Sequence, residues 1–333
     1  MPVQDRLGRP LRDLRVSVID ACNFRCPYCM PAERTPEGFG LDRDGRLTFD
    51  EIERLVRGFV RLGVRKLRLT GGEPLLRKNL PELVAQLAAI AGVEDLALTT
   101  NGSLLAGQAD ALRRAGLHRL TVSLDSLDPD RFAALSGGRG RVEQVLAGIA
   151  AAEAAGFGSI KINCVVRRGA NEADVLPLAA HFRGTGHVLR FIEYMDVGTC
   201  NGWRAQDVVP SAELREAIHA RWPLRPLAAR YRGEVANRHA FEDGAGEIGF
   251  VSSISAPFCG DCQRARLSAD GRLFGCLFAA NGRDLRPSLA GPDSGIDAAI
   301  SGVWQARADR YSEQRAERPG ASGRRIEMFM IGG

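Results

Sequence analysis

Residues 11–31 read LRDLRVSVIDACNFRCPYCMP, an apolar run followed directly by three cysteines. The run LRVSVI (14–19) predicts a buried β-strand. Cys22, Cys26 and Cys29 then follow, separated by three and by two residues. Short loops rarely meet disulfide geometry, and three thiols leave one over. We therefore interpret the three thiolates as ligands of a single metal centre at the end of a strand.

The same strand pattern recurs along the first 200 residues, with helical patterns between the strands. In residues 48–63 a Thr cap with Glu three residues later precedes apolar residues at helical spacing, which predicts a helix. Strands that alternate with helices predict a parallel sheet, either a partial (β/α) barrel or a doubly wound sheet. The predicted strands are 14–19, 65–70, 95–100, 118–124, 160–166 and 187–194, and the further predicted helices are 79–91, 103–114, 141–155 and 171–183.

Polar motifs stand at the ends of most of these strands. CNFRCPYC follows the first strand, GGEP (71–74) follows the second, and Asn-Gly (101–102) follows the third. SLD (123–125) closes the fourth strand and EYMDVG (193–198) closes the sixth. Ligands of parallel α/β folds collect at the carboxyl ends of the strands. The motifs therefore predict one active site at one mouth of the sheet.

The chain after about residue 200 loses this rhythm and mixes proline, glycine and charge. One helix is predicted near 211–220, followed by the strand-like runs GEIGFVSSIS, RARLSA and RLFGCLF. We predict a division into residues 1–200, a partial barrel, and residues 201–333, a smaller extension that packs against the barrel and covers its mouth.

A second cysteine group lies in this extension. Cys259, Cys262 and Cys276 are separated by two and by thirteen residues. Iron–sulfur clusters normally have four thiolate ligands, so a triad leaves one iron open to a small molecule. For this group alone zinc is equally compatible, whereas the spacing of the first group favours a compact cluster. Cys164 and Cys200 are assigned no role.

The composition excludes several classes of protein. The 333 residues, 45% hydrophobic and 26% charged, are enough for one barrel with an addition. There is no apolar run of about 18 residues and no secretory signal, so we expect a cytoplasmic protein with reduced thiols. Only five histidines occur, which argues against a zinc hydrolase or a Ser-His-Asp enzyme. The net charge of +5 is compatible with an anionic ligand, and no basic run indicates nucleic-acid binding.

Several ordered motifs carry a resemblance to a known family. LRDLRVSVIDACNFRCPYCMP, LRLTGGEPLLR, LTTNG, VSLDSLD, RFIEYMDVG, FCGDCQRARLSADGRLFGCLF and the terminal IGG resemble, in this order, the GTP 3′,8-cyclase family of radical S-adenosylmethionine enzymes. The resemblance implies a partial (β/α)6 barrel that uses S-adenosylmethionine and two [4Fe-4S] clusters. It also implies cyclisation of GTP to (8S)-3′,8-cyclo-7,8-dihydroguanosine 5′-triphosphate, the first step of molybdenum cofactor biosynthesis.

The resemblance assigns roles to individual residues. The resemblance implies that Cys22, Cys26 and Cys29 bind the first cluster. It also implies that the methionine part of S-adenosylmethionine binds the open iron of this cluster. The second cluster, whose open iron takes the guanine of GTP, is implied to be bound by Cys259, Cys262 and Cys276. The implied contacts of S-adenosylmethionine are Tyr28, Gly72, Ser123 and Met195. The implied contacts of GTP are Arg15, Arg68, Thr99, Lys161, Arg264, Ala265 and Arg266.

The residue pattern supports the anion contacts independently. Arg15, Arg68 and Lys161 stand within apparently buried strands, and a buried charge needs a partner that phosphate would supply. Alternation in QRARLS projects Arg264 and Arg266 to one side of a strand, close to the second cysteine group. Guanidinium groups grip phosphate oxygens in a fork geometry.

The GGEP motif has a similar physical interpretation. Gly71 and Gly72 lack side chains, so that the backbone approaches a ligand closely. Glu73 either accepts a hydrogen bond from the amino group of the cofactor or is a solvated turn residue.

The tail and the two remaining cysteines give further expectations. Gly332 and Gly333 are either a frayed terminus or, as the resemblance implies, a segment that enters the active site. A thiol close to a radical is a liability, so we expect Cys164 and Cys200 to lie away from the cofactor.

Two alternative functions and several partners complete the hypothesis. The alternatives are a radical S-adenosylmethionine peptide maturase with an auxiliary cluster and a zinc-binding module without enzymatic activity. Besides the GTP substrate, we expect a low-potential electron donor of the flavodoxin or ferredoxin type and a downstream cyclic pyranopterin monophosphate synthase. We expect no nucleic acid and no membrane as partners, and the sequence does not distinguish a monomer from a homodimer.

Overall fold

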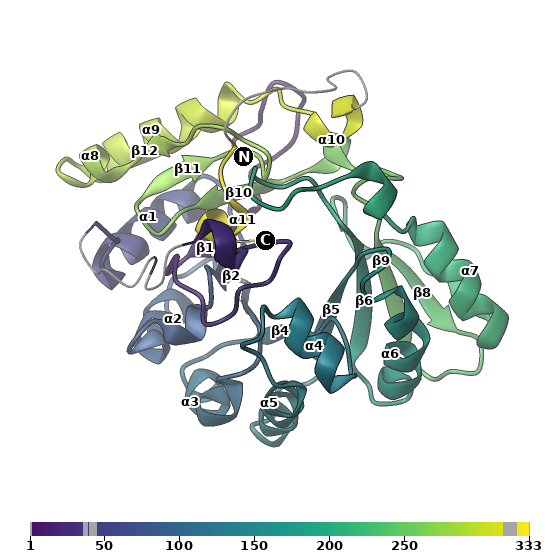
Figure 1. The fold of residues 1–333 in the computed structure, drawn as a ribbon. Helices are drawn as coiled ribbons and strands as arrows, with labels where there is room; N and C mark the ends of the chain where they lie inside the picture. Colours follow the sequence, from purple (N-terminus) through teal and green to yellow (C-terminus); the bar gives the residue numbers. More distant parts are fainter. Residues whose placement is uncertain (1, 36–38, 40–44, 316–324, 333) are drawn as a thin grey trace.

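The computed structural model describes residues 2–35, 39, 45–315 and 325–332, which form one curved sheet of twelve strands with helices on its outer side (Figure 1). The strand order is β12-β11-β10-β1-β2-β3-β4-β5-β6-β9-β8-β7. The central strands, from β10 through β1–β6 to β9, are parallel, and the outer strands are antiparallel. The predicted partial barrel is thus confirmed.

All strands predicted in the first 200 residues are present close to the predicted positions. They are β1 (Asp13–Ser17), β2 (Lys66–Thr70), β3 (Asp95–Thr100), β4 (Arg119–Ser123), β5 (Lys161–Val166) and β6 (Val188–Glu193). In β1, Leu14 and Val16 are buried in the hydrophobic core, whereas Arg15 between them lines a central cavity. The alternation therefore gives each strand an apolar face for packing and a polar face for ligands.

The helices follow the predicted pattern with some differences. The capping box of the first helix is present, because Thr48 Oγ1 accepts from Glu51 N and Glu51 Oε2 accepts from Thr48 N. The helices predicted from 103 and 171 begin later, because 3₁₀ turns occupy their first residues. The helices are α1 (Phe49–Arg61), α2 (Leu80–Ala88), α3 (Ala109–Arg114), α4 (Pro129–Leu135), α5 (Val142–Ala154), α6 (Val175–Phe182), α7 (Ser211–Arg221), α8 (Arg286–Leu289), α9 (Asp293–Gln305), α10 (Tyr311–Gln314) and α11 (Met328–Ile331).

The chain after residue 200 continues the sheet at both of its edges. β9 pairs with β6 in parallel, and β10 pairs with β1 in parallel. The extension therefore shares the sheet of the barrel as well as packing against it, and the division at residue 200 stays a prediction. The strands of the extension are β7 (Leu224–Pro226), β8 (Asn237–Phe241), β9 (Glu247–Val251), β10 (Arg264–Leu267), β11 (Arg272–Phe274) and β12 (Arg283–Asp284).

Helix α9, which the sequence analysis did not predict, closes the extension onto the barrel. It packs against α1, where a methyl group on Gly58 would lie 2.8 Å from Ile296 Cγ2. Glycine at this position lets the two helices approach closely. Within the described part of the chain, no helix is both long enough and apolar enough to cross a membrane.

Candidate functional site

One central cavity gathers most of the residues predicted to bind the substrate. It has a volume of about 1490 Å³ including its open mouth. The second cysteine group lines the same cavity, so its thiols face the interior and not the outer wall. The predicted site residues that line it are Arg15, Arg68, Thr99, Lys161, Met195, Cys259, Cys262, Arg264, Arg266 and Cys276.

Three arginines stand side by side on adjacent strands at the wall of this cavity. Arg15 is in register with Arg266 on one side and with Arg68 on the other. Burial, and next the positive charge of Arg266, lowers the pKa of Arg15 well below its usual value. Burial, and next the charge of Arg264, lowers the pKa of Arg266 to about 10. An anion would relieve this repulsion, so the row is suited to bind phosphate oxygens.

Two further cations on β5 and β6 line the same cavity. Burial, followed by repulsion from Arg190, lowers the pKa of Lys161 to about 7. Burial, followed by Arg68, lowers the pKa of Arg190 to about 9, and its guanidinium donates to Asn163 Oδ1 at 2.7 Å. Arg190 was not among the predicted site residues, although it has the signal that identified Arg15, a charge within a buried strand.

A loop of the extension crosses the cavity at the amino ends of the strands. The Lys66 ammonium lies 3.2 Å from the centre of the Tyr231 ring, and both residues line the cavity. Arg232 is paired with Asp261 at 2.6 Å, which ties this loop to the second cysteine group. The sequence analysis missed Lys66 and Tyr231. The available signal for Lys66 was that it is one of only three lysines and stands at the start of a predicted strand.

The first cysteine group forms a tight loop beyond the end of β1. Cys29 N donates to Cys26 O at 3.0 Å, and the buried Arg25 donates to Cys22 O at 2.7 Å. Burial raises the pKa values of Cys26 and Cys29, and each value is raised further by another thiol of the group. The thiols are therefore close enough to repel one another as thiolates, which bound iron would offset.

The donor sets fit iron–sulfur clusters better than single metal ions. Within the described residues, no three His, Cys, Asp or Glu side chains are arranged to hold one metal ion. Tetrahedral zinc requires its ligands to converge on one point, whereas the thiolates of a [4Fe-4S] cluster bind different iron atoms.

The GGEP motif braces the first cysteine group from the neighbouring strand. A methyl group on Gly72 would overlap the carbonyl of Ala21, so glycine is required here. Glu73 is not a solvated turn residue, since it is buried and its carboxylate accepts from Thr100 Oγ1 and Asn101 N, each at 2.7 Å. Burial raises its pKa to about 7. Glu73 thus joins the GGEP and Asn-Gly motifs.

Tyr28 reaches from the cysteine loop to the SLD motif. Its hydroxyl donates to Asp125 Oδ2 at 2.6 Å, and Asp125 Oδ1 accepts from Val165 N at 2.8 Å. Burial raises the pKa of Asp125 to about 6. Cys164, to which the sequence assigned no role, is fully buried in the core with its sulfur 3.7 Å from Asp125 O. Ser123, two residues before Asp125, ends β4 at the same edge of the sheet.

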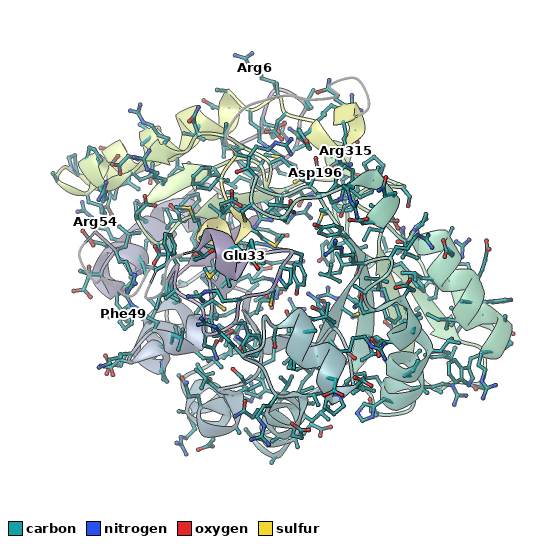
Figure 2. The ribbon with its side chains drawn as sticks, in the orientation of Figure 1. Arg6, Glu33, Phe49, Arg54, Asp196 and Arg315 are labelled. Carbon is teal, nitrogen blue, oxygen red and sulfur yellow. The ribbon has the colours of Figure 1, made fainter. Side chains whose placement is uncertain are left out.

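The loop after β6 carries Met195 and holds the C-terminal segment. Asp196 accepts from the Tyr311 hydroxyl at 2.5 Å and from Arg315 Nε at 3.0 Å. Figure 2 shows Asp196 and Arg315 directed toward each other. Arg325 donates to both the main-chain and the side-chain oxygen of Asp196. One carboxylate therefore anchors residues on both sides of 316–324.

The same loop places Cys200 beside the first cysteine group. Cys200 Sγ lies 3.6 Å from Cys29 O and 2.9 Å from Glu327 Oε2. The expectation that Cys200 lies away from the cofactor is wrong, because its sulfur contacts the main chain of Cys29, a predicted cluster ligand. Glu327 also accepts from Thr199 N at 3.0 Å. A methyl group on Gly198, whose φ is +74°, would overlap the Glu327 carboxylate.

The C-terminal segment returns to the cavity as far as it is described. Helix α11 lies against β1 inside the curve of the sheet (Figure 1). The Arg266 guanidinium donates to the carbonyls of Ile331 and Gly332. A side chain on Gly332 would overlap Thr70. Gly333, the other residue of the predicted pair, lies outside the described residues.

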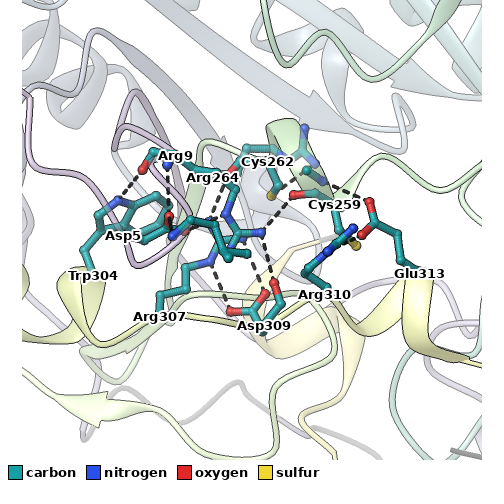
Figure 3. Close-up of polar contacts among 12 residues, drawn as sticks. Asp5, Arg9, Cys259, Cys262, Arg264, Trp304, Arg307, Asp309, Arg310 and Glu313 are labelled. Atoms are coloured by element: carbon teal, nitrogen blue, oxygen red, sulfur yellow. Dashed lines mark hydrogen bonds and ion pairs between the residues drawn. The ribbon is translucent and has the colours of Figure 1, made fainter. Parts of the chain in front are cut away.

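The second cysteine group meets cations on both sides (Figure 3). Arg264 Nη2 lies 3.4 Å from Cys262 Sγ, and Arg307 donates to Cys262 O at 2.8 Å. Burial opposes ionisation of Cys262, but Arg264 and Arg307 outweigh it and lower the pKa of this thiol to about 7. Burial raises the pKa of Cys276 to about 12. Cys262 therefore lies in an electropositive part of the cavity, whereas Cys276 lies within the influence of the Asp309 carboxylate.

One predicted contact does not present its side chain to the cavity. Ala265 is fully buried in the core and is in register with Leu14, whereas Arg264 and Arg266 line the cavity as the alternation predicts. A contact of Ala265 with substrate therefore requires its backbone, and it stays a prediction.

Comparisons with known families and structures agree with this arrangement. Residues 16–182 match the radical SAM superfamily, and residues 187–313 match the family Molybdenum Cofactor Synthesis C. Among solved structures, SuiB of Streptococcus suis bound to S-adenosylmethionine has a TM-score of 0.63 at 13% identity, covering 94% of this chain and 69% of its own. This likeness shows the fold alone.

Curated relatives are similar over almost their whole length. GTP 3′,8-cyclase of Xanthomonas campestris pv. campestris (strain B100) is 68% identical, covering 100% of this chain and 98% of its own. The enzymes of that name from Acidothermus cellulolyticus and Staphylococcus saprophyticus are 57% and 42% identical, covering 95% and 99% of this chain and 89% and 99% of their own. The chain therefore belongs to the GTP 3′,8-cyclase family of radical SAM enzymes.

Proposed function

We propose that this protein cyclises GTP to (8S)-3′,8-cyclo-7,8-dihydroguanosine 5′-triphosphate, the first committed step toward the molybdenum cofactor. The observation that carries the proposal is a cavity that joins a row of buried arginines to a cysteine triad. A triphosphate matches the arginines, and a triad leaves one iron of a [4Fe-4S] cluster open for a purine.

We assign the triphosphate to the cations of the cavity. Arg68 Nη1 donates to Thr99 Oγ1 and Thr121 Oγ1, each at 3.0 Å, so this guanidinium is held in a fixed orientation. Lys161 and Arg190 add positive charge that burial and mutual repulsion destabilise in the protein alone. Phosphate oxygens would relieve this cost, so binding is favoured by groups already in position.

We assign the guanine to the second cysteine group and the cofactor to the first. Arg264 and Arg266 extend from β10 beside Cys262, so they hold the nucleotide close to the second cluster. Cys22, Cys26 and Cys29 would hold the first cluster, and S-adenosylmethionine bound there would supply the radical chemistry at the ribose. Tyr28, Gly72, Ser123 and Met195 orient this cofactor, and Asp125 keeps Tyr28 in place.

The C-terminal segment excludes water from the reacting atoms in this proposal. Arg266 holds the carbonyl of Gly332 inside the curve of the sheet, and Glu327 holds the start of α11 against the loop after Met195. A reactive intermediate survives only where solvent and stray hydrogen donors are kept away. We therefore propose that Gly332 and Gly333 enter the site; at Gly332 a side chain would overlap Thr70.

Partners complete the proposed function. A low-potential flavodoxin- or ferredoxin-type protein delivers the electron, and a cyclic pyranopterin monophosphate synthase consumes the product. The chain acts as a monomer or a homodimer. In the proposed division, residues 1–200 carry the ligands of the first cluster and residues 201–333 carry those of the second.

The test compares two substrates in one reaction series. Anaerobically reconstituted protein is incubated with S-adenosylmethionine, a reductant and either GTP or a candidate precursor peptide. We expect 5′-deoxyadenosine and a cyclised nucleotide with GTP, and no modified peptide. The same reaction is run with Arg266→Ala, which changes a proposed contact of GTP. Arg225→Ala, at an exposed position of β7, is its matched control. Modification of the peptide with GTP left unchanged would overturn the proposal.

A further inference from the structure

Three buried charged residues pack against the second cysteine group (Figure 3), and one of them, Arg307, also lines the cavity. They are Asp5, Arg9 and Arg307, which we call the buried triad. The side chains of Asp5 and Arg9 are 0% exposed and that of Arg307 is 3% exposed. The proposed contacts of GTP include none of these three residues.

The two arginines share one carboxylate. Arg9 Nε lies 2.6 Å from Asp5 Oδ2, and Arg307 Nη1 lies 3.2 Å from the same oxygen. Asp309 adds a second acceptor at the edge, with its carboxylate 3.1 Å from Arg307 Nε and its carbonyl 2.9 Å from Arg9 Nη1. The charges therefore balance locally, and the geometry of both guanidinium groups is fixed.

Each arginine of the buried triad also holds the main chain of one cysteine. Arg9 Nη1 donates to Cys259 O at 2.8 Å, and Arg307 Nη1 donates to Cys262 O at 2.8 Å. These bonds hold the carbonyls of the two cysteines toward the triad, while both residues line the cavity. The short segment between them is thus clamped at both ends.

The clamp is connected to the hydrophobic core. Trp304 on α9 donates from its indole nitrogen to Arg9 O at 3.0 Å, and the Arg307 guanidinium lies 4.6 Å from the centre of its ring. Trp304 is 1% exposed. The position of the cysteine segment is therefore set by a rigid part of the fold.

Stability alone does not explain such an arrangement. Taking ions out of water is costly, and apolar residues of similar volume often replace a buried ion cluster without loss of stability. What apolar residues cannot do is donate to two carbonyls in fixed directions. The feature that depends on the buried charges is the orientation of the cysteine main chain.

We infer that Arg9 and Arg307 are positioning residues that hold Cys259 and Cys262 in the geometry required by the second [4Fe-4S] cluster. This inference rests on the proposed function, in which these cysteines are cluster ligands. Loss of either arginine therefore loosens the second cluster and leaves the first one in place. Lysine is not a substitute, because it lacks the fork that reaches an acceptor carboxylate and a carbonyl together.

The test uses conservative variants of the full chain after anaerobic cluster reconstitution. Arg307→Lys and Arg9→Lys are compared with Arg54→Lys, which changes an arginine that also holds two carbonyls, those of Leu289 and Gly291, at the outer surface (Figure 2). Iron per chain, the low-temperature electron paramagnetic resonance spectrum of the reduced protein and the melting temperature are measured for each.

We expect wild type and Arg54→Lys to hold two four-iron clusters, roughly eight irons per chain, and Arg307→Lys to lose about half of this iron. The signal that responds to S-adenosylmethionine should be unchanged in all variants. Asp309→Asn is a second variant in case the buried changes prevent folding, because Asp309 is 35% exposed. It should release iron to a chelator at an intermediate rate.

Two results would overturn the inference. In the first, Arg307→Lys retains all its iron and has an unaltered spectrum. In the second, Arg307→Lys loses both clusters in equal proportion and its melting temperature is lowered. If Arg307→Lys does not fold, the inference is overturned by an Asp309→Asn variant that releases iron no faster than wild type. If wild type itself holds only one cluster, the proposed assignment of Cys259, Cys262 and Cys276 fails instead.

Discussion

The two cysteine groups have opposite electrostatic surroundings. The first lies among carboxylates, since Glu73 and Asp125 are buried beside it and Glu327 approaches Cys29 through Cys200. The second lies among guanidinium groups, because Arg264 approaches Cys262 Sγ, Arg307 donates to Cys262 O, and both arginines line the cavity. The pKa of Cys262 is lowered to about 7, whereas that of Cys22 is raised to about 12, chiefly by burial and then by Glu73. The contrast is confined to Cys262, because burial and then Asp309 raise the pKa of Cys276 to about 12 as well.

This difference matches the charges of the two small molecules. S-adenosylmethionine carries a positive sulfonium group, whereas GTP carries a chain of phosphates. Opposite charges within a low-dielectric cavity attract strongly, so the proposed assignment of each molecule to its own cysteine group is electrostatically consistent.

The largest expected effect separates the two groups by function. Cys22→Ala should remove all cleavage of S-adenosylmethionine, because the first cluster loses a ligand. Cys276→Ala should remove the cyclised nucleotide while some 5′-deoxyadenosine is still formed. Chromatography of both products on one sample measures this, and Cys164→Ala serves as a buried control. Equal loss of both products in Cys276→Ala would contradict the division of labour.

The next effect concerns the arginine row beside the second group. Arg266→Ala should weaken GTP binding by about 2 kcal/mol, roughly thirtyfold in Kd, since a charged hydrogen-bond donor is lost from a buried site. Equilibrium dialysis with GTP measures the change, and Arg225→Ala should leave it unaltered. An Arg266→Ala variant with wild-type affinity would remove the row from the binding site.

A smaller effect is expected from pH through Lys161. Burial, and next Arg190, lowers its pKa to about 7 in the protein alone, so the ammonium loses its proton as the pH rises above 7. Bound phosphate raises that pKa, and binding then takes up a proton. GTP affinity should therefore be full below pH 7 and fall between pH 7 and about pH 9.

Lys161→Arg sharpens this prediction, because arginine keeps its charge throughout the range. The decline in affinity should disappear in this variant when Kd is measured at several pH values. An identical decline in Lys161→Arg would show that another group is responsible.

The smallest effect concerns the loop that joins the first group to the C-terminal segment. In Gly198→Ala the added methyl group would displace the Glu327 carboxylate. Hydrogen exchange of residues 325–332 should become faster, while that of β1 stays unchanged. Cys200→Ser, which keeps a donor for Glu327, is the matched control. Unchanged exchange in Gly198→Ala would mean that Glu327 does not hold this segment.

The fold was largely predictable because strand and helix periods are local properties. The runs at 95–100 and 160–166 alternate with helices at regular intervals, and tertiary packing only trims their ends. Placement of the extension was not predictable in this way. That β10 joins β1 depends on pairing over about 250 residues, which no local pattern encodes.

The candidate site was predictable where its signal was chemical. Clustered thiols and charges within buried strands identified Cys22, Arg15 and Lys161, whereas the same logic was not applied to Arg190. The position of Cys200 could not be predicted, since it depends on a contact with Glu327, 127 residues away. Ala265 shows the converse, because its neighbours line the cavity and its own side chain points into the core.

The central claim is that GTP binds at the second cysteine group, in the cavity lined by the arginines. Electron paramagnetic resonance of the reduced protein, recorded alone, with S-adenosylmethionine and with GTP, tests it directly. The account predicts two cluster signals, one altered only by S-adenosylmethionine and the other only by GTP. A GTP-insensitive spectrum, or a GTP response that persists after Cys276→Ala, would contradict it.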